Sequence, residues 1–162
     1  MNETLPASHI ADAQLLTADG KVDLYKITLV NGSFVYVKDN NDVTWQGNLY
    51  QGTFIKLTDN SQSSTGQLAR PHLVFANPTG IYSSLVGQGQ LDNATVVRYR
   101  VLYADVVANN NIFQQNTWKI RRIVSLDRNQ VTCELRDTLD GQFFMIPYRT
   151  FSYPEFPTVN LQ

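Results

Sequence analysis

Cysteine and histidine are scarce in this sequence of 162 residues. Cys133 stands alone, which excludes a disulfide bond within the chain and a metal site built from several thiolates. The only histidines are His9 and His72. Because a general base needs positioned partners, we expect both to be surface or structural residues. Cys133 alternates inward on an expected strand, so we expect a small buried hydrophobic residue rather than a nucleophile.

Charge is scarce too. Asp, Glu, Lys and Arg make up 17% of the chain, against about 25% in an average soluble domain. The net charge of -1 gives no overall electrostatic case for binding nucleic acid or an acidic membrane. No stretch approaches the roughly 18 apolar residues of a membrane-spanning helix, and residues 1–20 lack the apolar core of a signal peptide. We therefore expect a protein that folds in the cytoplasm without inserting into a membrane.

Motifs of known enzymes are absent from the sequence. There is no glycine-rich phosphate loop, no Gly-x-Ser-x-Gly and no His-Glu-x-x-His. A cell-wall hydrolase that uses Glu134 or Asp105 has a weak basis, because these acids lie on expected strands among arginines. We therefore expect no enzyme, no catalytic residues and no metal.

Alternation of apolar and polar residues is the dominant pattern in what remains. Tyr25, Ile27 and Leu29 alternate with polar residues, and Asn31-Gly32 then predicts a two-residue hairpin turn. Further strands are expected at residues 33–38, 43–45, 49–57, 68–76, 95–107, 118–124, 130–136 and 142–146.

A short helix is expected at residues 8–16, with Ser8 as its N-cap. Ile10, Ala13 and Leu16 share one face of that helix. Residues 81–90 form either a second short helix or an irregular arm, since Gly87 and Gly89 weaken a helix there. The sequence therefore predicts a mainly β fold: residues 1–146 form a single antiparallel β-barrel or sandwich domain with one or two short helices.

The last segment, residues 147–162, has no period of either kind, and its prolines exclude a central strand. Its aromatic residues are Tyr148, Phe151, Tyr153 and Phe156. Burying each large apolar side chain is worth about 1.5–3 kcal/mol. We therefore expect an extended C-terminal arm whose aromatic residues form a subunit interface or lie against the domain.

Five arginines make the middle of the chain locally basic: Arg98, Arg100, Arg121, Arg122 and Arg128. They could contact the phosphates of DNA. They could also form ion pairs, either with a neighbouring subunit or with the acids among them, which are Asp105, Asp127, Glu134 and Asp137. Because the acids and bases are interleaved, ion pairs are favoured.

Two other clusters have a functional and a structural interpretation. Trp45 and Tyr50 flank a tight turn and could stack on a sugar ring, but core packing is the commoner role of such aromatic residues. Residues 39–42 (Asp-Asn-Asn-Asp) could bind calcium, but they lack the spacing of a calcium loop. A plain turn is favoured there.

Several short sequence segments, here called blocks, follow one another in a recognisable order along residues 24–149. Their characteristic residues are Trp45, Gly47, Tyr50, Arg70, Pro71, Arg98 and Trp118. Leu73, Asn77, Gly80 and Ile120 accompany them, and a Pro-x-Arg ends the series at Arg149. In this order and at this spacing, the blocks resemble the N-terminal domain of the lambda-type minor tail protein L family of long-tailed phages.

The resemblance implies a structural protein of the virion, located at the tail tip and assembled in the bacterial host cytoplasm. It implies a homo-oligomeric ring of roughly three or six copies. The ring would join the distal tail tube protein to the central hub or fibre protein around a tape-measure protein, with DNA only as passing cargo. The alternative is a virion-associated carbohydrate-binding β-module that uses Trp45 and Tyr50.

The family continues into a cysteine-rich domain that holds an iron–sulfur cluster. This sequence stops where those cysteines are expected, and its one cysteine lies in a strand. Since such a cluster needs about four thiolates, we expect no cofactor.

Overall fold

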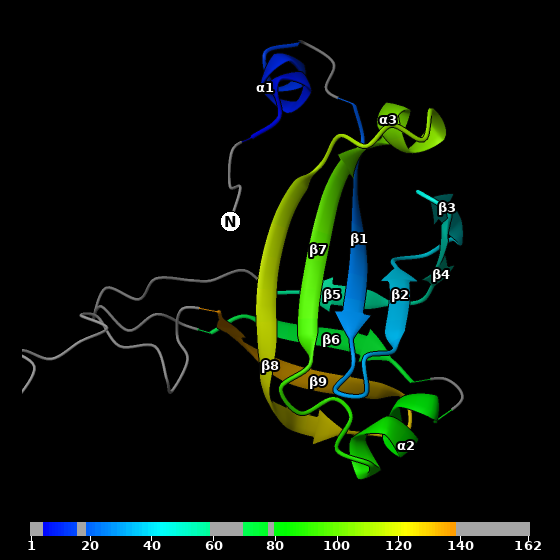
Figure 1. The fold of residues 1–162 in the computed structure, drawn as a ribbon, viewed down its shortest axis with the longest axis vertical. Helices are drawn as coiled ribbons and strands as arrows, with labels where there is room; N and C mark the ends of the chain where they lie inside the picture. Colours follow the sequence, from blue (N-terminus) through cyan, green and yellow to red (C-terminus); the bar gives the residue numbers. More distant parts are fainter. Residues whose placement is uncertain (1–4, 16–18, 59–69, 78–79, 139–162) are drawn as a thin grey trace, which may run out of the picture.

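The computed structural model describes residues 5–15, 19–58, 70–77 and 80–138, which contain a nine-stranded sheet and three short helices (Figure 1). In chain order the elements are α1 (Ala7–Ala13), β1 (Lys21–Thr28), β2 (Phe34–Lys38), β3 (Val43–Trp45), β4 (Asn48–Gly52), β5 (Ile55–Leu57), β6 (His72–Ala76), α2 (Ile81–Gly87), β7 (Thr95–Leu102), α3 (Tyr103–Val107), β8 (Gln114–Leu126) and β9 (Gln130–Asp137). The predicted mainly β fold is confirmed.

The strands follow the order β3-β4-β2-β1-β7-β8-β9-β6-β5, so the sheet has two edges and is bent rather than closed. In Figure 1, β1 and β7 run upright, while β5, β6 and β9 cross behind them. Strand β8 belongs to both halves, because it pairs with β7 through its first residues and with β9 through its later ones. Its pairing with β9 is interrupted by bulges between Ile120 and Arg122 and between Ile123 and Ser125, which is where strands bend and twist.

The main core lies between the two halves of the sheet. It contains Tyr25, Ile27, Leu29, Val37, Ile55, Leu73, Phe75, Leu91, Ala94, Val96, Ile120, Val131, Cys133 and Leu135. Helix α2 covers one end of this core with Tyr82, Leu85 and Val86. The alternation predicted for β1 and β9 is confirmed, and Cys133 is fully buried as expected. Burial raises the pKa of the Cys133 thiol to about 12, so the thiol is held protonated at neutral pH.

The hairpin predicted at Asn31-Gly32 is confirmed, but its turn is longer than two residues. The Leu29 N–H donates to the Ser33 carbonyl at 2.9 Å, which leaves residues 30–32 in the loop. Gly32 has a φ of +85°, whereas Asn31 is not in the left-handed region. The two-residue hairpin turns of types I′ and II′ both need a positive φ at their first residue, here Asn31, so the prediction of a two-residue turn is wrong.

The strand expected over residues 49–57 is two strands. Thr53 still pairs with β2, since its N–H donates to the Lys38 carbonyl at 2.8 Å. Phe54 already pairs with β6, since its carbonyl accepts the Ala76 N–H at 2.8 Å. The chain therefore crosses from one half of the sheet to the other between these two residues. The pairing of β4 with β2 is parallel, which differs from the antiparallel sheet expected.

The long strand expected at residues 95–107 ends at Leu102, where α3 begins. The Tyr103 N–H donates to the Gly20 carbonyl at 2.7 Å, and the Asp19 carboxylate accepts the Ala104 N–H at 2.9 Å. A carboxylate that satisfies an N–H group in the first turn stabilises a helix start. The side chain that stabilises the start of α3 therefore belongs to Asp19, which lies 85 positions away from Ala104 in the sequence.

Helix α1 is confirmed, but its predicted N-cap is wrong because Pro6 holds that position and no side chain caps the helix. The buried residues are His9 and Asp12, whereas Ile10 is exposed. The Asp12 carboxylate accepts the Asp19 N–H at 2.7 Å and so turns the polar face of the helix inward. His9 is therefore buried on the same side of the helix as Asp12.

Candidate functional site

The β3–β4 hairpin carries the Trp-containing block. Gln46 and Gly47 form its two-residue turn, both with positive φ (50° and 75°), which matches the right-handed twist of the strands. Trp45 and Tyr50 are 3% and 2% exposed, so the predicted core role of these aromatic residues is confirmed. The Trp45 indole N–H donates to the Asn110 carbonyl at 3.0 Å, which satisfies the polar group of the buried ring.

A second aromatic cluster surrounds this hairpin on the face of β1 and β7 that turns away from the main core. Phe113 meets Trp45 and Tyr99 edge to face, with ring centroids 5.6 and 5.0 Å apart. Tyr36 meets Tyr50 in the same way at 5.2 Å. Burial raises the pKa of Tyr50, so its hydroxyl stays protonated. The hairpin thus covers the face of β1 and β7 that turns away from the main core.

A small pocket of about 170 Å³ opens beside the hairpin. Its walls include Lys26, Tyr36, Gln46, Asn48, Asn111 and Phe113 together with Trp45 and Tyr50. The two predicted sugar-stacking residues line its floor but are almost wholly covered. Neither offers an open ring face to a ligand.

Arg98 lies inside the bent sheet rather than on its surface. The side chain is buried, donates from Nη2 to the Asn116 side-chain oxygen at 3.0 Å, and stacks 5.3 Å from the ring of Trp118. Burial raises the pKa of the neighbouring Tyr25 hydroxyl to about 12, although Arg98 acts in the opposite direction. Arg98 and Trp118, two of the block residues, are therefore packed against each other, with Arg98 buried and Trp118 partly buried.

Arg70 and Pro71, two further block residues, lead into β6. The Pro71 carbonyl accepts the Leu135 N–H at 2.8 Å and so fixes this segment to β9. Asn77 ends the same strand: its side-chain oxygen accepts the Tyr82 N–H at 3.2 Å, and its amide donates to the Ser83 hydroxyl at 2.8 Å. Asn77 is fully buried and positions the start of α2.

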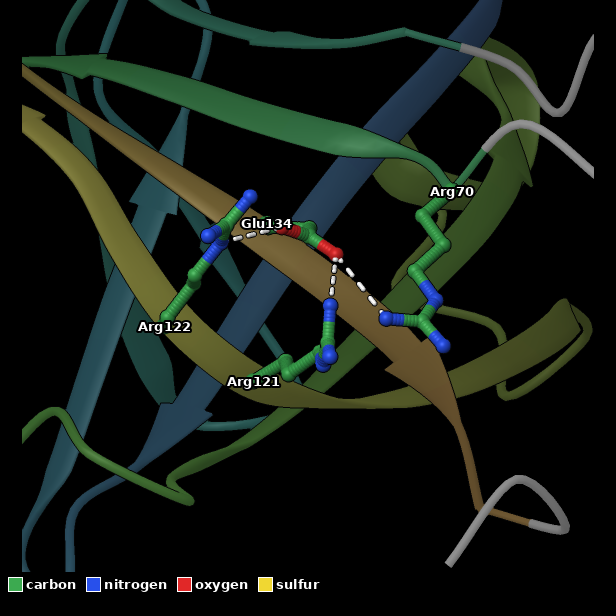
Figure 2. A network of polar contacts seen from close by, with 4 residues as sticks. All are labelled: Arg70, Arg121, Arg122 and Glu134. Carbon is green, nitrogen blue, oxygen red and sulfur yellow. Dashed lines mark hydrogen bonds and ion pairs between the residues drawn. The ribbon is translucent and has the colours of Figure 1, made fainter.

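Figure 2 shows three arginines that converge on Glu134. Arg70 and Arg121 donate to one carboxylate oxygen at 3.1 and 2.7 Å, and Arg122 donates to the other at 2.5 Å. The Glu134 side chain is 6% exposed, while those of Arg121 and Arg122 are 45% and 67% exposed. The arginines themselves therefore form the cover over the carboxylate.

Burial of Glu134 acts to raise its pKa, but the hydrogen bonds from Arg121, Arg122 and Arg70 outweigh it and lower the pKa to about 2. The carboxylate is thus ionised at every physiological pH. A group in this state is unsuited to act as a general acid, which removes the basis for a hydrolase built on Glu134.

We expect the free energy of unfolding to fall as the pH drops from about 4.5, the ordinary pKa of a glutamate, towards about 2. A lowered pKa stabilises the folded state above the unfolded pKa, and that contribution is lost as the folded pKa is approached. Since the arginines are partly exposed, we expect a loss of about 2 kcal/mol rather than the full value of the shift. Urea unfolding at a series of pH values measures it. Glu134→Gln is the control, and an equally steep fall in that variant would contradict the assignment.

The ion-pair interpretation of the arginine-rich middle is confirmed for Arg121 and Arg122, through Glu134. Arg100 also forms an ion pair, but with Asp23 at 2.8 and 3.0 Å, an acid that the sequence interpretation missed. The two residues lie opposite each other on β7 and β1. The ion pair could therefore have been predicted only if the pairing of these two strands had been known.

Residues 39–42 form a turn, as favoured. Asn40 has a φ of 68°, and the Lys38 ammonium donates to the Asp39 carbonyl at 2.8 Å. The Asp42 carboxylate accepts the Gly52 N–H at 2.6 Å and holds the turn against β4. Within the ranges that the structure describes, no group of three His, Cys, Asp or Glu side chains is placed to hold a metal ion. The described helices are all too short or too polar to cross a membrane.

The aromatic residues of the predicted arm, Tyr148, Phe151, Tyr153 and Phe156, and the strand expected at residues 142–146 lie outside the described residues.

Comparison with known proteins places this fold in a family. The family model of phage minor tail protein L matches residues 31–154. A comparison with curated proteins gives no match. A chain in the solved virion of a native gene transfer agent particle has a similar fold, with a TM-score of 0.63 at 17% sequence identity. That alignment covers 83% of this chain and 46% of the other, so this chain spans less than half the length of that protein.

At 17% identity the likeness to the gene transfer agent chain shows the fold alone. The family match is stronger, because it runs from the β1–β2 turn through all the later strands. The chain therefore belongs to the phage minor tail protein L family and is a structural protein of a phage tail.

Proposed function

We propose that the chain is a ring-forming adaptor at the tip of a long phage tail, where it joins the distal end of the tail tube to the central hub or fibre protein. The observation that carries the proposal is the family match over residues 31–154, which includes every described strand after β1. The partners are other tail proteins, including a tape-measure protein, and DNA passes only as cargo. The role is geometric, since a rigid body sets the position of its neighbours.

Apolar side chains exposed at both ends of the domain support contacts with neighbours on two sides. Ile10, Tyr103 and Val107 are exposed on α1 and α3, which lie at one end in Figure 1. Val30 and Ile81 are exposed in the β1–β2 turn and on α2, at the other end. An adaptor between a tube and a hub needs such surfaces at opposite ends, since exposed apolar side chains gathered at one place often mark contact sites.

The arm, residues 147–162, extends this proposal. Its four aromatic residues would lie against the next subunit or another tail protein and so hold the ring together. Each buried side chain would add about 1.5–3 kcal/mol to the contact.

Gold labelling of an epitope tag on this chain, followed by electron microscopy of purified phage, tests both parts. We expect label only at the tail tip. With residues 147–162 deleted, we expect the label and infectivity to be lost, because the arm holds the subunit in place. Thermal unfolding of the truncated chain is the control for its fold. Label along the tube would contradict the adaptor, and normal infectious particles from the deletion would contradict the role of the arm.

Carbohydrate binding is the second candidate function. The pocket beside the β3–β4 hairpin favours it, because aromatic and amide side chains line its walls. The burial of Trp45 and Tyr50 weighs against it, since sugar stacking needs an exposed ring face. A glycan array with the purified chain separates the two functions: an adaptor gives no signal, whereas a lectin binds a defined glycan.

A further inference from the structure

A groove of about 360 Å³ opens between the first residues of β1 and strand β5. Its walls come from β1, from the end of β2 with the turn that follows, and from β5, which crosses behind β1 in Figure 1. The charged residues of this groove are Lys21, Asp23, Lys38, Asp39 and Lys56. The groove is therefore polar and contains more lysines than acids.

The acids of the groove leave its lysines largely without counter-ions. The Asp23 carboxylate already accepts two hydrogen bonds from Arg100, at 2.8 and 3.0 Å. Asp39 is thus the one lining carboxylate outside an ion pair, against three ammonium groups. Among the residues that the structure describes, neither Lys21 nor Lys56 forms an ion pair. The groove therefore holds positive charge that an acidic ligand could neutralise.

A buried guanidinium adds to this charge. Tyr25 lines the groove, lies opposite Arg98 in the pairing of β1 with β7, and interacts with its side chain. Arg98 is 9% exposed, its Nε has no hydrogen-bond partner, and no carboxylate in the described part of the chain pairs with it. A buried charge without a counter-ion is costly, and its field is weakly screened by solvent. Arg98 is thus an independent indication that a negative group belongs beside Tyr25.

The edge of β5 that borders the groove has free backbone groups. Strand β5 ends the order of the described sheet and pairs only with β6. The Phe54 carbonyl and the Thr58 N–H both bond to β6. Because hydrogen-bonding residues alternate in an antiparallel pair, the N–H and C=O groups of Ile55 and Leu57 point away from β6. Both residues line the groove, so it offers donors and acceptors to an added strand.

We propose that the groove binds an extended, acidic segment of a neighbouring protein. The segment pairs with the free edge of β5 and sets its carboxylates against Lys21 and Lys56. A lysine on an edge strand deters pairing with strands in general, so Lys56 selects a strand that carries acids. The inference goes beyond the adaptor function, because it identifies a binding surface and the chemistry of its occupant wherever the chain lies in the tail.

A polypeptide suits the groove better than a nucleic acid does. The carboxylates of Asp23 and Asp39 lie on its walls and would repel a continuous chain of phosphates. The free N–H and C=O groups of Ile55 and Leu57 match the backbone of another strand, which supplies both acceptors and donors. A phosphate chain supplies acceptors alone.

Fluorescence anisotropy of the full chain with labelled octapeptides tests the proposal. The probe is a peptide in which Glu and Thr alternate, and the comparison peptide has Lys in place of every Glu. At about 50 mM salt we expect the acidic peptide to bind at least about tenfold more tightly than the basic one, and to bind more weakly at about 500 mM salt, because salt screens charge pairs. In an NMR titration, the amide signals of Ile55 and Leu57 should shift most.

The variant Lys21→Gln/Lys56→Gln removes two exposed ammonium groups from the groove. We expect it to bind the acidic peptide at least about tenfold more weakly. The matched control is Lys119→Gln/Arg128→Gln, which removes the same charge outside the groove and should bind like the wild type. Equal binding by the groove variant and the wild type would overturn the proposal, as would equal binding of the acidic and basic peptides.

Two further probes test the chemistry of the occupant. The acidic octapeptide with every backbone nitrogen methylated keeps its charge and loses its N–H donors, so we expect it to bind at least about tenfold more weakly. Equal binding of the methylated peptide would overturn the strand pairing. An oligothymidylate of the same length that bound more tightly than the peptide, through the same lysines, would make nucleic acid the occupant and overturn the proposal.

The gold-labelling experiment is independent of these measurements. Label away from the tail tip would contradict the adaptor function and leave the groove unaffected. A groove that binds no acidic peptide, in a chain that still labels the tail tip, would overturn only the inference.

Discussion

Replacing Gly52 by alanine is expected to destabilise the domain severely. An added Cβ would lie 2.1 Å from the Asn40 carbonyl oxygen and 2.7 Å from the Asn41 carbonyl carbon. Both are backbone atoms, so no side-chain rotation can relieve the overlap. The turn that contains them is also tied to Gly52, whose N–H donates to the Asp42 carboxylate at 2.6 Å. The clash must therefore push the 39–42 turn away from β4.

We expect the Gly52→Ala variant to lose at least about 3 kcal/mol of unfolding free energy, a large part of the 5–15 kcal/mol typical of a domain. Urea unfolding followed by circular dichroism measures the loss. Gly87→Ala is the matched control, because its added Cβ would meet no atom within 4 Å. That variant should be neutral or slightly more stable, since alanine favours a helix. An unchanged urea midpoint for Gly52→Ala would contradict the close contact.

Trp45→Ala is expected to have an effect of similar size. The ring is almost fully buried and touches Tyr50, Tyr99 and Phe113. Its removal leaves a cavity and also leaves the Asn110 carbonyl without its indole donor. Such truncations of buried Trp cost about 3–5 kcal/mol.

Thermal unfolding of Trp45→Ala and Trp45→Phe separates packing from hydrogen bonding. Trp45→Phe keeps an aromatic ring and loses only the indole N–H and some volume, so we expect a loss of about 1–2 kcal/mol. If Trp45→Ala unfolded at the wild-type temperature, Trp45 would not be a core residue, and the sugar-stacking interpretation would regain support.

Local sequence patterns were sufficient for most strands and for the position of the hairpin at Asn31-Gly32, because each depends on neighbouring residues. Pairing between distant segments was not predictable in the same way. The parallel contact of β4 with β2 depends on how the 39–42 turn folds back, and α3 replaces the end of a strand because Asp19 reaches it from the other side of the fold. Leu24 and Tyr25 are both buried, because each face of β1 is covered; the alternation of Tyr25, Ile27 and Leu29 predicted the first covered face but not the second.

The candidate site was predicted in part. The aromatic pair Trp45 and Tyr50 was correctly assigned to the core, and Glu134 was correctly named as a partner of arginines. The convergence of three arginines on one carboxylate depends on a bulge in β8, which no local pattern of charge or hydrophobicity encodes. The need for glycine at position 52 was missed for a similar reason. It arises because the backbone of the 39–42 turn packs against Gly52 and leaves no room for a Cβ.

The two halves of the sheet share backbone as well as side-chain contacts. Strand β8 runs through both, and the chain crosses between them a second time at Thr53 and Phe54. Neither half can separate from the other without breaking hydrogen bonds within its own ladder. A mechanical load applied to one half, such as the pull of a neighbouring tail protein, would therefore be carried by continuous polypeptide to the other half instead of being concentrated at a flexible hinge.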